Sequence, residues 1–173
     1  MQVGGFPPDE HRHDDSGVIE RINLLAERLR SRGQPVIFVQ HDGSAEGRFI
    51  PGSPEWALLP ALHVADGDIV IAKTANDAFY STQLASILDT VGAREVIVTG
   101  WATDFCVDAT VRSAMSHDYD VVVVADGHTV GDRPDLTAKQ VVEYHNWLWP
   151  GLTPTLGRVR VLPCDKLLIE DLS

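Results

Sequence analysis

The chain contains few cysteines and few basic residues, and both shortages exclude broad classes of protein. Only two of its 173 residues are cysteine, too few for a disulfide framework, and we expect a reducing, cytoplasmic setting. Lys and Arg number 14 against 25 Asp and Glu, so the formal net charge is −11. Nucleic acid and anionic membrane surfaces both select for clustered basic side chains, and we therefore expect neither as a partner.

Long apolar runs, internal repeats and low-complexity segments are also missing. A bilayer-spanning helix needs about 20 apolar residues, and the apolar runs here have only the length of strands. These runs alternate with amphipathic segments, a pattern typical of α/β domains. We therefore expect a single domain over residues 1–173, with a doubly wound, mostly parallel sheet in a Rossmann-like three-layer sandwich.

Five segments are apolar almost throughout, as expected of parallel strands that helices cover on both faces. They are 35–41, 68–73, 94–100, 119–126 and 158–164. The amphipathic helices are expected at 17–33, 81–92 with Ser81 as a possible N-cap, 107–118 and 136–149. The long Pro- and Gly-rich connection 42–62 follows the first of these strands, and such connections usually carry function.

Ligands of an open parallel sheet bind outside the carboxyl ends of its strands. Lys73 ends one expected strand, and Cys106 lies in GWATDFCVDAT, where another strand gives way to a helix. The start of a helix offers unpaired N–H groups and partial positive charge, which favour a thiolate and could hold an oxyanion. Alternatively, Cys106 is a small buried hydrophobe and Lys73 a solvated strand end, and position alone leaves both readings open.

The run GWATDFCVDAT resembles the G-x-x-T-x-x-C-V-x-x-T signature of isochorismatase-like cysteine hydrolases, and IAKTANDAFYSTQL is similar to the segment around that superfamily's lysine. The resemblance implies that Cys106 is the nucleophile and Lys73 a second member of a catalytic triad. It also implies a cis peptide bond before Thr103 and an oxyanion hole from backbone N–H groups near Thr103 and Cys106. The implied reaction is hydrolysis of an amide, ureido or carbamoyl C–N bond in a small molecule through a thioester, by a homo-oligomer without a cofactor.

The third triad member is where the sequence departs from this resemblance. Family members open with a buried strand that ends in the general-base Asp, whereas Met1 and Gln2 match the two residues after that Asp. We therefore expect the strand and its carboxylate to be missing, through a start assigned too late at an internal Met. Two strands about 9–10 Å apart would then have unpaired edges. Substitutes for the carboxylate would be Asp9, Asp14 or Asp15, which lie in a polar segment that reads as a loop.

Four residues are candidates for contacts with the substrate. Phe6, Tyr80 and Trp101 each flank an expected catalytic element and are candidates for the pocket wall. His128 in DGHT either faces the pocket or is a loop histidine bonded to backbone. Since the expected Asp is missing, two functions stay open: a cysteine amidohydrolase, or an impaired or non-enzymatic relative that acts through its assembly.

Several other polar and aromatic residues receive structural interpretations. His41, Asp42 and His63 lack the spacing of the nicotinamidase zinc site, so we expect no metal. The remaining expectations are a capping or solvating role for Asp104 and Asp108, a structural role for Cys164, and a place in the core or a subunit contact for Trp147 and Trp149.

Overall fold

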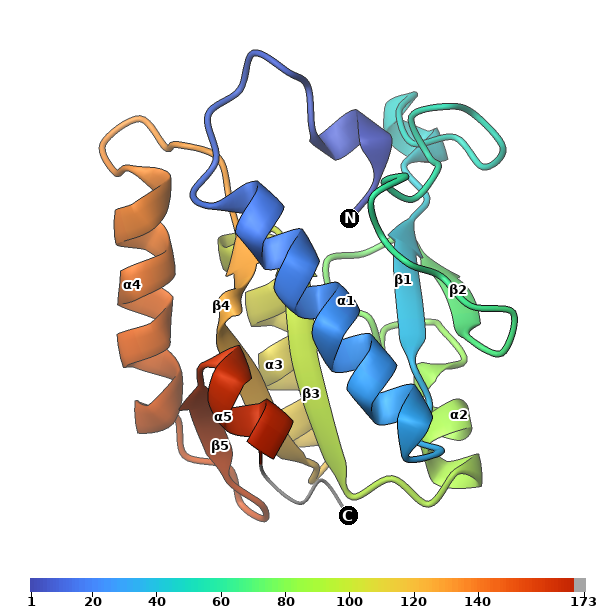
Figure 1. The fold of residues 1–173 in the computed structure, drawn as a ribbon, viewed down its shortest axis with the longest axis vertical. Helices are drawn as coiled ribbons and strands as arrows, with labels where there is room; N and C mark the ends of the chain where they lie inside the picture. Colours follow the sequence, from blue (N-terminus) through green and yellow to red (C-terminus); the bar gives the residue numbers. More distant parts are fainter. Residues whose placement is uncertain (170–173) are drawn as a thin grey trace.

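Strands and helices alternate along the chain in the computed structural model, which describes residues 1–169 (Figure 1). The strands are β1 (Ile37–His41), β2 (Ile69–Lys73), β3 (Glu95–Trp101), β4 (Asp120–Thr129) and β5 (Val159–Leu162). The α-helices are α1 (Asp15–Ser31), α2 (Leu84–Thr90), α3 (Asp108–Ser116), α4 (Ala138–Leu148) and α5 (Cys164–Ile169). Shorter helical turns are η1 (Val3–Gly5), η2 (Ser44–Glu46), η3 (Thr103–Val107) and η4 (Trp149–Gly151).

All five expected strands are present, and the helices differ from expectation mainly at their ends. The expected N-cap at Ser81 is wrong: its φ is 53°, and α2 begins three residues later with Gln83 before it. Helix α5 was not expected, and it begins at Cys164, the residue with which the predicted last strand ends. These differences leave the α/β class unchanged.

The strands form two parallel sheets rather than one continuous sheet. Strand β1 pairs with β2, and β3, β4 and β5 pair in that order, all of them parallel. Among the described residues no strand pairs with the other edge of β1 or of β3. The expected α/β fold with parallel strands is therefore confirmed, and within residues 1–169 β1 and β3 each have one edge without a paired strand.

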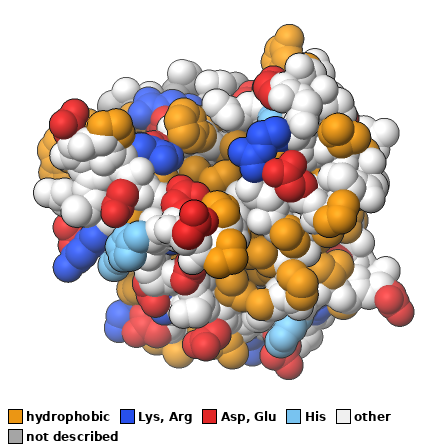
Figure 2. Space-filling view, turned by 90° about the horizontal axis from the view of Figure 1, so that it is seen from above, with side chains coloured by type: hydrophobic (Ala, Val, Ile, Leu, Met, Phe, Trp, Pro, Cys, Tyr) orange, Lys and Arg blue, Asp and Glu red, His pale blue; other side chains and the backbone are white. Residues whose placement is uncertain are grey.

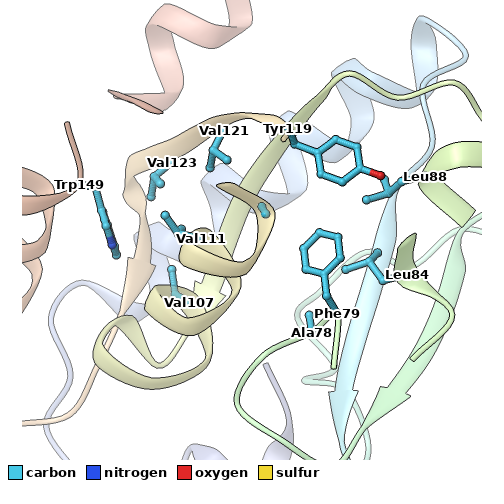
Figure 3. Close-up of a cluster of buried hydrophobic side chains, with 11 residues drawn as sticks. Ala78, Phe79, Leu84, Leu88, Val107, Val111, Tyr119, Val121, Val123 and Trp149 are labelled. Carbon is cyan, nitrogen blue, oxygen red and sulfur yellow. The ribbon is translucent and has the colours of Figure 1, made fainter. Parts of the chain in front are cut away.

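Strand β4 shows how the helices cover both faces of the larger sheet. Val121 and Val123 point into a cluster with residues of α2 and α3, several of which are drawn in Figure 3. Val122 and Val124 point the other way, against α1 and α5. Successive side chains of a strand alternate between its faces, so an uninterrupted valine run fills both layers of the core.

Helix α4 supports the end of β3 from a third cluster. Val141 and Val142 pack with Val130 and with Ala102, the residue that follows β3. Thr137 and Gln140 form a capping box at the start of the helix. This helix therefore packs against the turn that leads from β3 into α3.

Candidate active site

The end of β3 bends into the turn that carries Cys106. The register with β4 shifts between Val98 and Gly100, and Gly100 has a φ of 121°, a conformation that favours glycine. The peptide bond between Trp101 and Ala102 is cis. The π-helical turn η3 follows and continues directly into α3. Cys106 thus lies half-buried where a strand gives way to a helix, as the sequence indicates.

Lys73 and Cys106 lie side by side although 33 positions separate them in the chain. The Lys73 Nζ atom is 3.1 Å from Cys106 Sγ and donates to the backbone oxygens of Ala75 at 2.6 Å and Asn76 at 2.9 Å. The expectation that these two strand-end residues meet is therefore confirmed. Within residues 1–169 no carboxylate forms an ion pair with Lys73, although its side chain is buried.

The two cysteines have different surroundings. Lys73 Nζ lies 3.1 Å from Cys106 Sγ, so a side chain that can carry a positive charge is in contact with this sulfur. Cys164 is 2% exposed, and burial raises the pKa of its thiol. The arrangement therefore suits Cys106 for nucleophilic chemistry and agrees with a structural role for Cys164.

A buried network fixes Thr103 at the start of the turn. Its hydroxyl lies 2.9 Å from His128 Nδ1, and His128 Nε2 lies 3.0 Å from Asn146 Oδ1. Burial lowers the pKa of His128 to about 4, so the imidazole is neutral at pH 7. His128 is 1% exposed and packs edge-on against Trp149, so the expectation that it faces the pocket is wrong. His128 therefore holds the start of the turn in place through its contact with Thr103.

A cavity of about 540 Å³ opens beside Cys106. Met1, Lys73 and Trp101 line its end nearest the thiol. Phe6 contacts Trp101, with ring centroids 5.6 Å apart, and supports this wall. Tyr80 is 63% exposed and does not line the cavity. Figure 2 shows the face at the carboxyl ends of the strands, where hydrophobic side chains gather with charged side chains beside them.

Three polar residues near this end have roles that the sequence did not indicate. The Gln2 amide donates to the His41 backbone oxygen at 3.1 Å and accepts from the His41 N–H at 2.7 Å. The buried Arg12 guanidinium donates to the Gly5 oxygen at 2.6 Å. The Asn76 Oδ1 atom lies 3.7 Å from Cys106 Sγ. The partners of Gln2 and Asn76 are distant in sequence, so no local pattern indicates these contacts.

The acidic residues suggested as substitutes for the missing base do not contact the thiol. Asp14 pairs with Arg21, and Asp15 accepts from the backbone N–H that follows it. Asp9 is exposed. Within the described chain the hydrogen-bond partners of Cys106 Sγ are Lys73 and Asn76, and neither is a carboxylate.

Asp104 and Asp108 also differ from expectation, because neither caps its helix with its side chain. Asp104 forms a two-pronged ion pair with Arg133, with both N–O distances 2.7 Å. Asp108 accepts from the indole N–H of Trp149 at 2.9 Å. Both carboxylates therefore connect the turn and α3 to the α4 side of the molecule.

Two wider features of residues 1–169 concern metals and membranes. No group of three or more His, Cys, Asp or Glu side chains in this part of the chain is placed to hold a metal ion, and His41, Asp42 and His63 form no such group. None of the helices in the same residues combines the length and apolarity needed to span a membrane.

The isochorismatase domain family matches residues 1–146, so the chain belongs to this family. Streptothricin hydrolase of Streptomyces noursei is 33% identical over 117 residues, covering 68% of this chain and 42% of that protein. Ureidoacrylate amidohydrolase RutB of Methylorubrum extorquens is 32% identical over 163 residues, covering 76% and 66%. The crystal structure of an isochorismatase from Pseudomonas putida KT2440 superposes with a TM-score of 0.83 at 27% identity, covering 95% and 84%. The chain spans less than half of the streptothricin hydrolases that it matches.

Proposed function

We propose that the chain is a cysteine hydrolase that cleaves the C–N bond of a small amide, ureido or carbamoyl compound. The observation that carries this proposal is the 3.1 Å contact between Lys73 Nζ and Cys106 Sγ at the carboxyl edge of the sheets. The named activities of the relatives support it, since one is a hydrolase and another an amidohydrolase of a ureido compound. A catalytic thiolate must stay reduced, which favours a cytoplasmic setting.

The proposed reaction is an acyl transfer in two stages. The Cys106 thiolate, stabilised by Lys73, attacks the carbonyl carbon, and the electron pair of the C=O bond moves onto its oxygen. The tetrahedral intermediate collapses, the C–N bond breaks, and the nitrogen takes a proton from the Lys73 ammonium group and leaves as amine or ammonia. Water then attacks the thioester carbon, the C–S bond breaks to release the acid and the Cys106 thiolate, and the proton lost by the water returns to Lys73.

The turn that carries the thiol supplies the proposed oxyanion hole. Thr103 begins η3, and the first N–H groups of a helix have no partner within it. Backbone N–H groups near Thr103 and Cys106 would donate to the developing negative charge, and the start of a helix adds partial positive charge. In this scheme His128 is a positioning residue, because it bonds the Thr103 side chain and does not reach the cavity.

The test is hydrolysis of a panel of small primary amides, ureido acids and carbamoyl compounds, followed by release of ammonia or amine. We expect turnover in at least one class, a covalent acyl adduct on Cys106 by mass spectrometry, and no turnover after Cys106→Ala. Lys73→Met should lower kcat by about 100-fold or more, because the thiolate loses its counter-ion.

Cys164→Ala is the matched control, since it removes the other thiol and should leave turnover unchanged. The proposal fails if the panel yields no turnover and no adduct, or if turnover survives Cys106→Ala. Failure with a folded protein would favour the alternative, a family member that acts through its assembly. The lack of a carboxylate beside Cys106 is the observation that keeps this alternative open.

A further inference from the structure

The Asn76 side chain meets the Cys106 sulfur from outside the cavity. Its Oδ1 atom accepts from Cys106 Sγ at 3.7 Å. Asn76 is exposed and is not one of the residues that line the cavity, whereas Cys106 lines it. Within residues 1–169 this sulfur is the only hydrogen-bond partner of the Asn76 carboxamide. A molecule that approaches the sulfur from solvent therefore meets a carboxamide that is free to bind it.

The backbone around Asn76 fixes this carboxamide in place. The Asn76 backbone oxygen accepts from Lys73 Nζ at 2.9 Å, and the Ala78 N–H donates to Thr110 Oγ1 at 3.2 Å. Thr110 lies four residues after Cys106, about one helical turn along the same side. Ala78 is buried in the core cluster that Figure 3 shows. The segment is thus attached to the lysine and to the helix that follows the thiol, and the Asn76 side chain makes none of these bonds.

Lys73 offers this site hydrogen-bond donors and no acceptor. An ammonium group has three N–H donors, and those of Lys73 face the Ala75 oxygen, the Asn76 oxygen and Cys106 Sγ. In the proposed reaction the hydrogen that faces the sulfur goes to the leaving nitrogen. Of the two side chains that bond Cys106 Sγ in the described chain, only Asn76 has an oxygen that accepts a hydrogen bond from that nitrogen.

The Asn76 oxygen becomes available at the step in which the nitrogen arrives. While the thiol keeps its hydrogen, the S–H group donates to Asn76 Oδ1. The thiolate that attacks the carbonyl has no hydrogen, so Oδ1 loses this donor. The nitrogen of the ligand is then bonded to the same carbon as the sulfur, which brings its N–H group within reach of Oδ1. An N–H bond to Asn76 would also leave the nitrogen lone pair of the tetrahedral intermediate free to face Lys73.

We propose that Asn76 is a specificity-determining residue that selects ligands whose amide nitrogen carries a hydrogen. The ligands are primary carboxamides and other compounds that end in a –CO–NH2 group. Esters and N,N-dialkyl amides have no such hydrogen, so they leave Asn76 Oδ1 without a donor from the ligand. The inference rests on the proposed function for the reaction at Cys106 and adds the group that recognises the nitrogen. Because Asn76 is exposed and water competes for its oxygen, we expect the effect of a single hydrogen bond.

The first experiment requires no hydrolysis. The complete 173-residue chain is treated with 2-iodoacetamide or with N,N-dimethyl-2-iodoacetamide, and mass spectrometry of the digested protein gives the rate of modification of Cys106. In both reactions the sulfur displaces iodide from the same carbon, and only the first reagent has amide hydrogens. The ratio of the two rates is divided by the ratio for free cysteine, which removes the intrinsic difference between the reagents. We expect a normalised preference for 2-iodoacetamide of about fivefold.

Three variants test whether the preference comes from the Asn76 oxygen. Asn76→Leu has a similar size and no acceptor, so the normalised preference should fall to about one. Asn76→Asp keeps an acceptor oxygen and should retain the preference, since a ratio of two rates cancels the effect of the added charge on the thiol. Asn23→Leu is the matched control on α1, where the carboxamide bonds the backbone of Ala61 and His63, and it should keep the full preference. The Asn76 variants should fold, because the backbone makes the structural bonds at this position.

The second experiment measures the same selection during turnover. It compares kcat/KM for a primary amide and for the methyl ester of the same acid. Asn76→Leu should lower kcat/KM for the amide by about tenfold and change that for the ester by less than about twofold. A general disturbance of the site would instead lower both values by the same factor.

Four results would overturn the inference. They are equal normalised rates for the two reagents, a preference that persists in Asn76→Leu, a preference that is lost in Asn76→Asp, and equal losses of amide and ester turnover. Amide hydrolysis together with any of these results would leave the proposed function standing without Asn76. A preference that depends on Asn76, without hydrolysis of any amide or ester, would support the inference and count against the proposed function alone.

Discussion

Strands β3 and β4 are neighbours in one sheet and carry similar valine-rich sequences, yet they are buried to different extents. Val123 of β4 is 0% exposed, whereas Val98 of β3, its partner in the register, is half-buried. Among the described residues, β4 has a partner strand on each edge, whereas β3 has a partner on one edge. An apolar run therefore indicates how buried a strand can become, and the neighbouring strands and helices determine how buried it is.

The largest difference between the two strands is expected when the same charged residue is substituted into each of them. Val123→Asp buries a carboxylate without a partner and should lower the free energy of unfolding by about 4 kcal/mol or more. Val98→Asp should cost about 1–2 kcal/mol, because water reaches a half-buried carboxylate. Urea denaturation at pH 7 measures both. Equal losses would mean that the open edge of β3 is as well covered as β4.

A second difference between the two strands is that β4 carries a buried histidine, His128. Its folded-state pKa of about 4 lies below the usual 6.5, so the unfolded chain binds more protons between these values. The contribution of the buried, neutral His128 side chain to the free energy of unfolding is therefore complete above pH 6.5 and decreases as the pH falls toward 4. Between pH 7 and pH 4 the wild type should lose about 3 kcal/mol more than His128→Gln, measured by denaturation at each pH. Identical pH profiles would contradict the assignment.

A third test compares the reactivity of the two cysteines, Cys106 beside the cavity and the buried Cys164. Iodoacetamide at pH 7 should modify Cys106 at least about tenfold faster than Cys164, a difference of about 1.4 kcal/mol in activation free energy. Mass spectrometry of the digested protein over time gives the two rates. Lys73→Met should slow modification of Cys106 and leave Cys164 unchanged. Equal or reversed labelling would count against an activated thiol.

The smallest expected effect concerns two tryptophans near the end of α4. Trp149 is fully buried, whereas Trp147 is 73% exposed. Trp147→Ser should therefore change the free energy of unfolding by less than about 0.5 kcal/mol in a monomer. The sequence also suggested a subunit contact here. Measurement at two protein concentrations tests that idea, since a large, concentration-dependent loss would place Trp147 in an interface.

The sequence predicts the elements that depend on local pattern and chain connectivity. Apolar runs locate the five strands, and because parallel strands end at one edge, they bring Lys73 and Cys106 together. The break between the sheets follows only from the family resemblance, since nothing in β1 or β3 alone indicates a missing neighbour. The link from Thr103 through His128 to Asn146 was not predictable, because each partner comes from a different element.

The first residues of the chain contact both sheets beside the cavity that Cys106 lines. Gln2 is bonded to the end of β1, and Gly5 lies against the Trp101 ring of β3, so closely that a Cβ atom there would come within 2.7 Å of it. These residues therefore connect the end of β1 to the end of β3. A larger side chain at position 5 would therefore have to displace the Trp101 ring, which lines the cavity beside Cys106.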